Sequence, residues 1–453
     1  MGAPFGAPLA PERDRWTGAI GAVLAAALLG RALQVDSGHY RPEAVVWLSL
    51  AFAILLAAVA APQIAALARH GPAAALAAVA VGIGYEAVDL LGRLPGMYLH
   101  LTARSDVLPF FAGVVVSAAL AGLALARESW RRVCVPLLLL VHLLLGVWII
   151  RVSPDPQTDV HAFQRDASAA LLSGHGPYGI PHPGLGVDPR FYGPGLVVNG
   201  QPRIGLPYPP LSAVLSLPGH LLGDHRYSLL AATILAAALM AFLRPGPLSA
   251  GGAALFLLTP RRSFVLEQGF TEPYVVLALA FVVLCAFRFR RALPYAVGLF
   301  FAVKQYGVLA APLLALLLPR PLSWREIWGL VWKAGATALA VTLPLALVDP
   351  KAFVRDVVLF QVQQPFRWDS LSFLAWLARG TGAPLPGWLG FLALAALTAL
   401  GLWRAPRTPA GFALGVGLAF FGFFAFGKQA FANYYLFVLG ALCLAVSASA
   451  PDA

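Results

Sequence analysis

Apolar segments of near-bilayer length follow one another along almost the whole chain, and this pattern limits the possible folds more than any other feature. Hydrophobic residues make up 59% of the 453 residues and charged residues only 11%, which is typical of a polytopic membrane protein. Because a span needs ~20 residues and several segments are shorter, we expect about 12–14 transmembrane helices. The apolar segments are residues 16–33, 44–61, 72–92, 107–126, 133–150, 227–243, 249–260, 273–287, 293–303, 306–318, 328–348, 385–403, 409–426 and 430–447.

This pattern predicts an all-α polytopic membrane protein and a division of the chain into three parts. We expect a four-helix membrane segment over residues 1–132, the main transmembrane region over residues 133–447 and a tail over residues 448–453. The polar N-terminus lacks a clear cleavage motif before its apolar run, which favours an uncleaved first helix. The three cysteines lie in apolar runs without a CxxC or Cys/His cluster, which disfavours structural zinc and a disulfide framework.

Short arginine-rich loops indicate the orientation, because such loops are cytoplasmic. They fall on one side of the membrane if the N-terminus is cytoplasmic, and the C-terminus is then cytoplasmic too. This orientation places residues 151–226, 261–272, Lys304, 349–369 and 428–435 on the extracytoplasmic side. The scatter of basic residues between apolar runs argues against a nucleic-acid partner, and the excess of arginine over lysine, with abundant alanine, favours a bacterial cytoplasmic membrane. The arginines are Arg127, Arg131, Arg132, Arg288, Arg290, Arg291, Arg320, Arg325, Arg404 and Arg407.

Residues 151–226 form a long polar segment among these apolar runs. An enzyme that acts on a lipid-anchored substrate needs such a segment, with a carboxylate at the water boundary above apolar walls. Its end, residues 207–222, is apolar but broken by proline. We expect an interfacial or re-entrant helix there, because a full crossing would invert everything downstream. The polar and aromatic residues of this segment include Asp155, Asp159, His161, Arg165, Asp166, Tyr178, Asp188, Arg190 and Tyr208.

Several stretches occur in an order that resembles a known family. They read TDVHAFQRDASAALLSGHGPYG, LPYPPLSAVLSLPGHLL, FVLEQGFTEPYVVLALAF, GLFFAVKQYGVLAAPLLALLLPR and KQAFANYYLF. This order is similar to the GT-C superfamily of integral-membrane glycosyltransferases, and within it to glycosyltransferase family 87, whose members use polyprenyl-phosphate sugars. The resemblance covers about residues 133–447 and implies a GT-C-like helical bundle whose long extracytoplasmic loop carries short interfacial helices. It leaves the first four spans unexplained, and the Glu267-Gln268-Gly269 order departs from the usual Gly-Gln.

The resemblance implies an inverting transfer of a sugar, mannose in the first place and arabinofuranose as a competitor, to an extracytoplasmic glycolipid or glycan acceptor. The lipid phosphate is already a good leaving group, so the reaction mainly needs a base that takes the proton of the acceptor hydroxyl. Asp159 is the candidate base by its match to the family motif. It can also act as the N-cap of a helix over residues 160–172, and the two roles are compatible. Asp155 is the rival base, but its Ser-Pro-Asp-Pro context predicts a turn.

The leaving phosphate needs cations, and four are candidates for donor binding. Lys304 interrupts an apolar run, where a charge is expensive and indicates function, although it can instead snorkel to the outer boundary. Arg261 and Arg262 can clamp the phosphate or anchor a loop, and Arg165 can hold it or pair with Asp166. The candidates for sugar or acceptor binding are His161, Tyr178, Tyr208, Glu272, Lys428 and Asn433.

The sequence has no GxxxxGK[ST] loop, no GxGxxG after a strand and no HExxH, which disfavours nucleotide hydrolysis and a Rossmann domain. A divalent cation that bridges Asp159 and the phosphate is compatible with the superfamily, but the sequence shows no dedicated carboxylate cage. The metal requirement therefore stays open. The expected partners are the polyprenyl-phosphate sugar, its acceptor and membrane lipids.

Two other classes of function fit parts of the pattern. A multi-pass transporter or lipid-linked sugar flippase fits the number of spans and the charges at membrane depth, but transporters commonly show two similar halves, and none are visible here. An O-antigen ligase or polymerase shares the lipid-linked donor. Such an enzyme is expected to have its large outer loop late in the chain, whereas this loop follows the fifth span.

Overall fold

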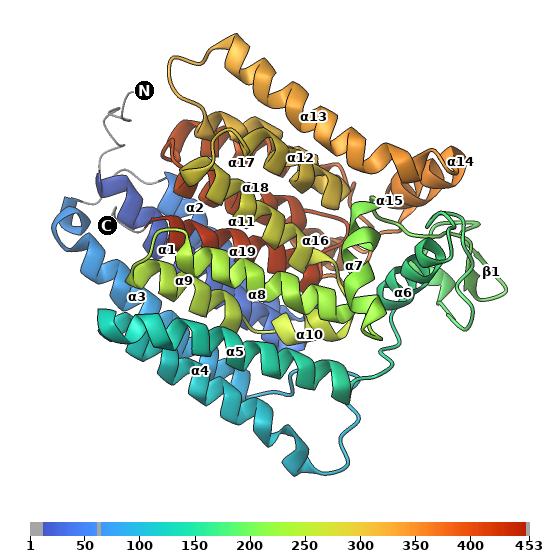
Figure 1. Ribbon diagram of the computed structural model, residues 1–453, viewed down its shortest axis with the longest axis horizontal. Helices are drawn as coiled ribbons and strands as arrows, with labels where there is room; N and C mark the ends of the chain where they lie inside the picture. Colours follow the sequence, from blue (N-terminus) through green and yellow to red (C-terminus); the bar gives the residue numbers. More distant parts are fainter. Residues whose placement is uncertain (1–11, 61–64, 450–453) are drawn as a thin grey trace.

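The computed structural model describes residues 12–60 and 65–449, and almost all of its regular structure is helical (Figure 1). Each of the fourteen apolar segments predicted from the sequence corresponds to a helix, which confirms the all-α membrane fold. Residues 1–11 and the end of the predicted tail, residues 450–453, lie outside the described residues. The first five long helices are α1 (Glu12–Asp36), α2 (Pro42–Ala60), α3 (Ala65–Leu91), α4 (Leu108–Ala126) and α5 (Glu128–Val152).

The later helices are mostly shorter, and most of them pack side by side in the middle of the molecule, whereas α13 lies along one edge (Figure 1). Most residues of α18 and nearly all of α19 are buried, as expected for helices that are apolar on every face. These helices are α8 (Arg226–Phe242), α9 (Pro247–Leu258), α11 (Glu272–Arg288), α12 (Leu293–Val303), the 3₁₀ helix η3 (Gln305–Leu317), α13 (Trp324–Ala346), α16 (Phe373–Thr381), α17 (Leu389–Arg404), α18 (Pro409–Ala425) and α19 (Ala432–Ala448).

The number of full-length spans is lower than the 12–14 expected from the sequence. By length and composition, six helices of the described residues can cross a membrane, or seven if the bent pair α7–α8 is one span. The difference lies in α9, α12, η3, α17, α18 and α19, which are apolar but only 10–17 residues long. Such short helices can lie at membrane depth where other protein segments surround them. The chain is thus a multi-pass helical membrane protein. The long helices α2, α3, α4 and α13 are largely exposed, whereas the long helix α1 and the short helices α9, α18 and α19 are mostly buried.

The N-terminal helices are packed into this bundle. Helix α1 contacts α2, α3 and α19, and α3 also contacts α9. The approach of α1 to α2 is so close that a Cβ on Gly21 would lie 2.1 Å from the Cβ of Ala58, which is typical of small-residue helix contacts in membranes. The N-terminal segment therefore shares a core with the region that resembles the transferases.

The segment between α5 and α8, called the outer segment below, folds at one end of the bundle (Figure 1). It packs with residues 350–363 around a second hydrophobic core that includes Phe163, Leu206 and Val357. The buried carboxylate of Asp356 joins the two parts, since its Oδ2 accepts 2.8 Å hydrogen bonds from the backbone N–H groups of Gly179 and Gly205. The elements here are α6 (Asp159–Leu172), η2 (Pro189–Phe191), the hairpin β1 (Val197–Val198) and β2 (Gln201–Pro202), α7 (Leu211–Leu221), α14 (Pro350–Phe353), the π-helical turn η4 (Val354–Leu359) and α15 (Phe360–Gln363).

Residues 207–222 contain the short helix expected there. Helix α7 meets α8 at an angle of 108° after a short break. The sharp turn is consistent with a helix that closes the outer segment and does not cross the membrane by itself. Its interfacial or re-entrant position stays a prediction.

Candidate functional site

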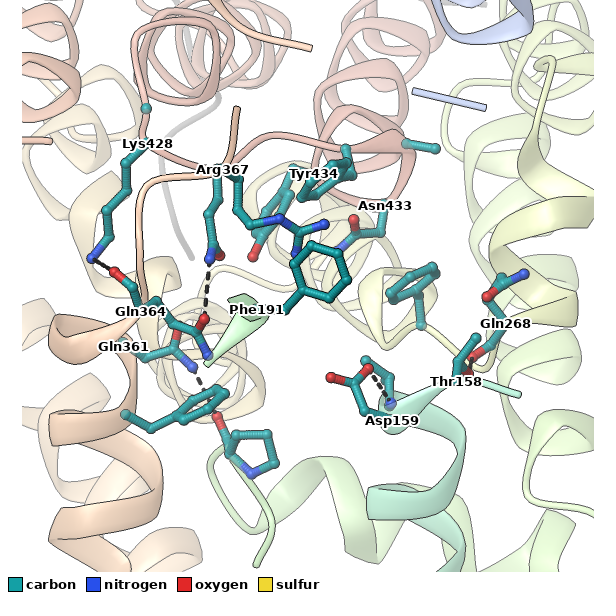
Figure 2. Close-up of a pocket in the computed structure, with 18 of the residues that line it drawn as sticks. Thr158, Asp159, Phe191, Gln268, Gln361, Gln364, Arg367, Lys428, Asn433 and Tyr434 are labelled. Atoms are coloured by element: carbon teal, nitrogen blue, oxygen red, sulfur yellow. Dashed lines mark hydrogen bonds between the residues drawn. The ribbon is translucent and has the colours of Figure 1, made fainter. Parts of the chain in front are cut away.

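A cavity of about 1020 Å³ lies where the polar end of the bundle meets the outer segment. Its lining draws on residues 157–208, 264–270, 304–309, 360–367 and 423–434. These are parts of the five segments that the loop charges place on one side of the membrane, so their predicted convergence is confirmed. Figure 2 shows Asp159 and Lys428 on different sides of the cavity, with Arg367 between them. The side of the membrane that the cavity faces stays a prediction.

Asp159 is the first residue of α6 and lines the cavity. The N-cap of this helix is Thr158, whose hydroxyl accepts from the backbone N–H of His161 and donates to the carbonyl oxygen of Gln268 at 2.9 Å. The alternative in which Asp159 itself is the N-cap is therefore wrong. Thr158 takes over that role and fixes the start of α6 against the end of α10 (Arg262–Glu267), which leaves the Asp159 carboxylate facing the cavity.

A tyrosine from the outer segment orients this carboxylate. The hydroxyl of Tyr192 lies 2.5 Å from Oδ2 of Asp159, while Oδ1 accepts the backbone N–H of Val160 at 2.8 Å. Burial and the neighbouring Asp159 charge raise the pKa of Tyr192 far above its usual range. Tyr192 therefore stays protonated and donates to the carboxylate. Sequence reasoning did not find Tyr192, because its contact with Asp159 is set by the fold of the loop.

Lys304 occupies the break between α12 and η3, and its side chain lies inside the protein. The residue is 4% exposed, so the alternative in which Lys304 snorkels to the membrane boundary is wrong. Its ammonium forms an ion pair with the Glu272 carboxylate and donates to Thr271 Oγ1 at 3.0 Å. An ammonium group has three donors, and these two bonds leave one to point toward the cavity that Lys304 lines.

Three tyrosine rings surround the Lys304 ammonium. Their centroids lie 4.8 Å (Tyr208), 5.6 Å (Tyr306) and 5.9 Å (Tyr434) from Nζ, within the range of cation–π attraction. Asn433 completes the group, since its side-chain amide donates to Glu272 Oε1 at 3.0 Å. The structure thus brings Lys304, Glu272, Tyr208 and Asn433, all predicted site residues, into one cluster beside the cavity.

Another part of the cavity wall carries basic and amide side chains. The Arg367 guanidinium lies 4.1 Å from the Phe191 ring centroid and 4.7 Å from that of Phe431, and it pairs with Asp369. Lys428 donates to the carbonyl oxygens of residues 362 and 364 at 3.0 and 2.7 Å. Lys428 was predicted as a binding residue, whereas the sequence assigned Arg367 no particular role. The sequence feature that could have indicated a role for Arg367 was the polar Arg-Trp-Asp run in this loop.

The same cavity has an apolar wall made by α17, α18 and η3. It includes Leu309, Phe391, Phe423 and Phe424. Phe391 is 54% exposed and Trp388, which also lines the cavity, is 58% exposed. Because these side chains line the cavity and are more than half exposed, the apolar wall is not fully covered by other described residues.

The arginine pair lies outside the cavity lining. The Arg262 guanidinium is buried and donates to the carbonyl oxygen of Leu257, in the last turn of α9, and contacts His142 Nδ1 at 2.8 Å. Arg261 donates to the carbonyl oxygen of Leu94 at 3.0 Å. Both arginines thus connect helix ends, in keeping with the alternative of a loop anchor and not with a clamp on a phosphate in this cavity.

Three other predicted residues also lie outside the lining. Arg165 pairs with Asp166 at 2.8 Å, which is the alternative considered for it. Tyr178 is buried and its hydroxyl donates to the carbonyl oxygen of Tyr208 at 3.1 Å, so it supports the backbone beside the cavity and its ring is not available to stack on a sugar. His161 packs against His225, with ring centroids 4.7 Å apart. These three side chains do not line the cavity and can influence it only through the residues that they contact.

The N-terminal segment contributes to the lining through Ser37, His39, Met97 and Tyr98. The buried Glu267 carboxylate holds this part in place, since it accepts the backbone N–H groups of Met97 at 2.7 Å and Tyr98 at 2.8 Å. The resemblance left the first four spans without a role. The structure shows that their loops form part of the cavity.

Fold and cavity together define a multi-pass, all-α membrane protein with one large site that joins a polar end to an apolar wall. Comparison with protein-family models, with curated proteins and with solved structures found no match. The function is therefore argued from the site itself.

Proposed function

We propose that the chain is an inverting glycosyltransferase that moves a sugar, in the first place mannose, from a polyprenyl-phosphate donor to an extracytoplasmic glycolipid or glycan acceptor. It acts in the bacterial cytoplasmic membrane with a GT-C-like bundle. The observation that carries the proposal is the composition of the cavity. One cavity brings together an oriented carboxylate, a buried ammonium and an apolar wall with exposed aromatic side chains.

The Asp159 carboxylate acts as the general base. It takes the proton of the acceptor hydroxyl while the hydroxyl oxygen forms a bond to the anomeric carbon of the donor sugar. The bond from that carbon to the phosphate oxygen breaks, and the lipid phosphate leaves with the electron pair. Attack from the face opposite the phosphate inverts the configuration. The Tyr192 hydroxyl, 2.5 Å from Oδ2, holds the carboxylate in one orientation during this step.

Two cations of the lining are suited to the leaving phosphate. The third N–H of Lys304 donates to it without disturbing the pair with Glu272, because Glu272 and Thr271 occupy only two donors. Arg367 is fixed between two phenylalanine rings and Asp369, and a guanidinium of this kind recognises phosphate oxygens well. Lys304 is the donor-binding residue in this proposal, and Arg367 supports it.

The isoprenoid tail follows the apolar wall toward Phe391 and Trp388. Burial of apolar surface is worth roughly 25 cal/mol per Å², so a long prenyl chain contributes much of the donor affinity. The exposed aromatic side chains mark where the chain enters from the bilayer. A divalent cation at Asp159 remains compatible with this arrangement, and Asp159 and Asp188 are carboxylates of the lining that can bind it.

Replacement of Asp159 by Asn tests the proposal. Loss of the base is expected to reduce sugar transfer about 10²–10⁴-fold, with donor binding unchanged, in membranes supplied with radiolabelled polyprenyl-phosphate mannose. Asp155→Asn is the matched control, because Asp155 lies four residues earlier in an exposed turn outside the lining. Equal turnover in the two variants would remove Asp159 as the base.

A flippase for lipid-linked sugars is the second candidate. One observation favours it: Glu86 on α3 is fully buried at membrane depth, and neither carboxylate oxygen has a hydrogen-bond partner among the described residues. Ionisable groups of this kind often mark transport pathways. Proteoliposomes that move the labelled lipid between leaflets without any transfer would establish this function over the enzyme.

A further inference from the structure

Two histidines and an aspartate form a compact group behind the cavity. His161 lies in the first turn of α6, and Asp224 and His225 lie in the turn between α7 and α8. One ligand atom from each residue can be chosen so that all three lie within 4.8 Å of one another. The imidazole rings are tilted by 43°, with centroids 4.7 Å apart. None of the three residues lines the cavity, so this group is separate from the proposed donor site.

The two imidazoles each carry a buried nitrogen without a partner. His161 is 7% exposed and His225 is 1% exposed, and neither His161 Nδ1 nor His225 Nε2 has a hydrogen bond among residues 12–60 and 65–449. A buried polar atom left in this state costs about 1–3 kcal/mol. Two such atoms in neighbouring rings need an explanation, and a bound cation is one that can satisfy both.

The Asp224 carboxylate is held in place for such a role. Its Oδ1 accepts the backbone N–H and the Nε–H of Arg226, and its Oδ2 accepts the Nε–H and an Nη2–H of the same residue. The Arg226 guanidinium is fully buried and also donates to the carbonyl oxygens of Glu267 and Ile150. The single Nε–H of Arg226 is shared between the two carboxylate oxygens, so one oxygen can exchange this contact for a metal ion. Metal-bound carboxylates commonly accept hydrogen bonds from a second layer of residues. Arg226 therefore orients the oxygen ligand of the group.

A glycine leaves the space beside the imidazoles open. Gly269 has a φ of +73°, and a Cβ there would lie 3.0 Å from His225 Nε2 and 3.4 Å from His161 Cβ. Any side chain at this position would meet the unpartnered nitrogen. The backbone of this left-handed residue thus lies directly against the two histidines.

We propose that His161, His225 and Asp224 bind a divalent transition-metal ion, with Zn²⁺ as the best fit. Two imidazole nitrogens and one carboxylate oxygen suit Zn²⁺, whose ligand atoms lie about 2.0–2.2 Å from the ion.

The ion would join the start of α6 to the α7–α8 turn. His161 lies two residues beyond Asp159 on the same helix, so the ion would fix the helix that carries the proposed base. It is a positioning site, because neither the ion nor its ligands line the cavity. Metal binding does not depend on the proposed transferase activity, and the two can fail separately.

Metal binding to the full chain tests this proposal directly. The protein is purified in detergent without a polyhistidine tag, stripped with a chelator and titrated with Co²⁺ and then with Zn²⁺. We expect one ion per chain, with cobalt absorption bands of a four- or five-coordinate site that Zn²⁺ displaces. His161→Gln and His225→Gln are each expected to weaken binding at least ~100-fold, because loss of a direct ligand exceeds the ~10–100-fold effect of an outer-layer partner.

His220→Gln is the matched control, since His220 lies near the end of α7, close to this turn but outside the group. It is expected to keep the affinity of the unchanged protein. If a ligand variant fails to fold, X-ray absorption of the cobalt-loaded wild type still counts its imidazole ligands, and two are expected. No stoichiometric binding, unchanged affinity in both ligand variants or a spectrum without imidazole would overturn the proposal.

Discussion

Lys304 and Arg262 are both buried cations in apolar surroundings, but their environments differ. Lys304 lies on the cavity wall, is paired with Glu272 and is surrounded by three tyrosine rings. Arg262 lies away from the cavity and binds the carbonyl oxygen of Leu257 and the ring of His142. The sequence made both candidates for the donor phosphate: Lys304 because it breaks an apolar run, and Arg262 because it forms an adjacent pair with Arg261 on the same predicted side and an arginine can clamp a phosphate.

The difference shows that a buried charge alone does not define a binding site. Arg262 begins α10 just after α9 ends, and its side chain turns back to a carbonyl that the last turn of α9 leaves without an intrahelical partner. Lys304 sits at a break between two helices, where its neighbours are side chains from distant parts of the chain. The cation that meets side chains from several elements lines the cavity, and the one that meets backbone supports a helix end.

The largest expected effect concerns the Lys304–Glu272 pair. Lys304→Met leaves the Glu272 carboxylate buried without its cation and should lower the free energy of unfolding by about 3–5 kcal/mol. Lys304→Met combined with Glu272→Gln should recover most of this loss, because no buried charge remains. Donor affinity should be about 10–100-fold weaker than in the unchanged protein in both the single and the double variant, since a charge-assisted hydrogen bond contributes about 1.5–3 kcal/mol. Thermal unfolding and binding of a short-chain prenyl-phosphate sugar measure the two quantities.

Lys351→Met is the matched control, because Lys351 is exposed on α14. Its stability and donor affinity should equal those of the unchanged protein. Normal donor affinity in the double variant would show that Lys304 has only a structural role, and its difference from Arg262 would then disappear.

A smaller effect is expected at Arg262, and on stability alone. Arg262→Met removes the donor from the Leu257 carbonyl and from His142, which should cost about 2–4 kcal/mol in unfolding free energy. Donor affinity should change less than about twofold, since the donor phosphate does not reach this position. The surface change Arg325→Met is the control. If Arg262→Met lowered the free energy of unfolding by less than Arg325→Met does, this would contradict the account. Arg325 lies exposed in the first turn of α13.

The smallest expected effect is a difference in donor affinity between variants of Tyr208 and Tyr178. Tyr208→Leu removes the ring nearest to the Lys304 ammonium, so donor affinity should fall about 3–30-fold, as expected for about 0.5–2 kcal/mol of cation–π attraction. Tyr178→Phe removes a hydrogen bond to the Tyr208 carbonyl and should cost about 1 kcal/mol of stability with little change in binding. Equal donor affinities in the two variants would argue against the tyrosine cluster as part of the site.

The sequence predicted the helices well because each apolar run ends at polar residues, glycine or proline. The loop charges also predicted that five polar segments meet, and their parts line one cavity. The sequence predicted too many full spans. An apolar run of 12 residues, such as α9, has the composition of a short span, but in the structure it is a helix inside the protein.

Pairings between distant residues could not be predicted. Nothing in the sequence indicates that Asn433 and Lys304 share the Glu272 carboxylate, or that Glu267 binds the backbone of residues 97 and 98. These contacts join segments far apart in the chain, and only packing brings them together. For the same reason, the contribution of the N-terminal loops to the cavity was not foreseen.

The central claim is that one cavity holds a lipid phosphate at Lys304 and its tail along Phe391. A density map of the protein reconstituted with a polyprenyl-phosphate sugar tests it most directly. We expect phosphate density beside the Lys304 ammonium, the sugar within hydrogen-bond reach of Asp159 and a tail that leaves the bundle past Trp388. Lipid density that binds only on another face of the bundle, with the cavity filled by water alone, would contradict the account.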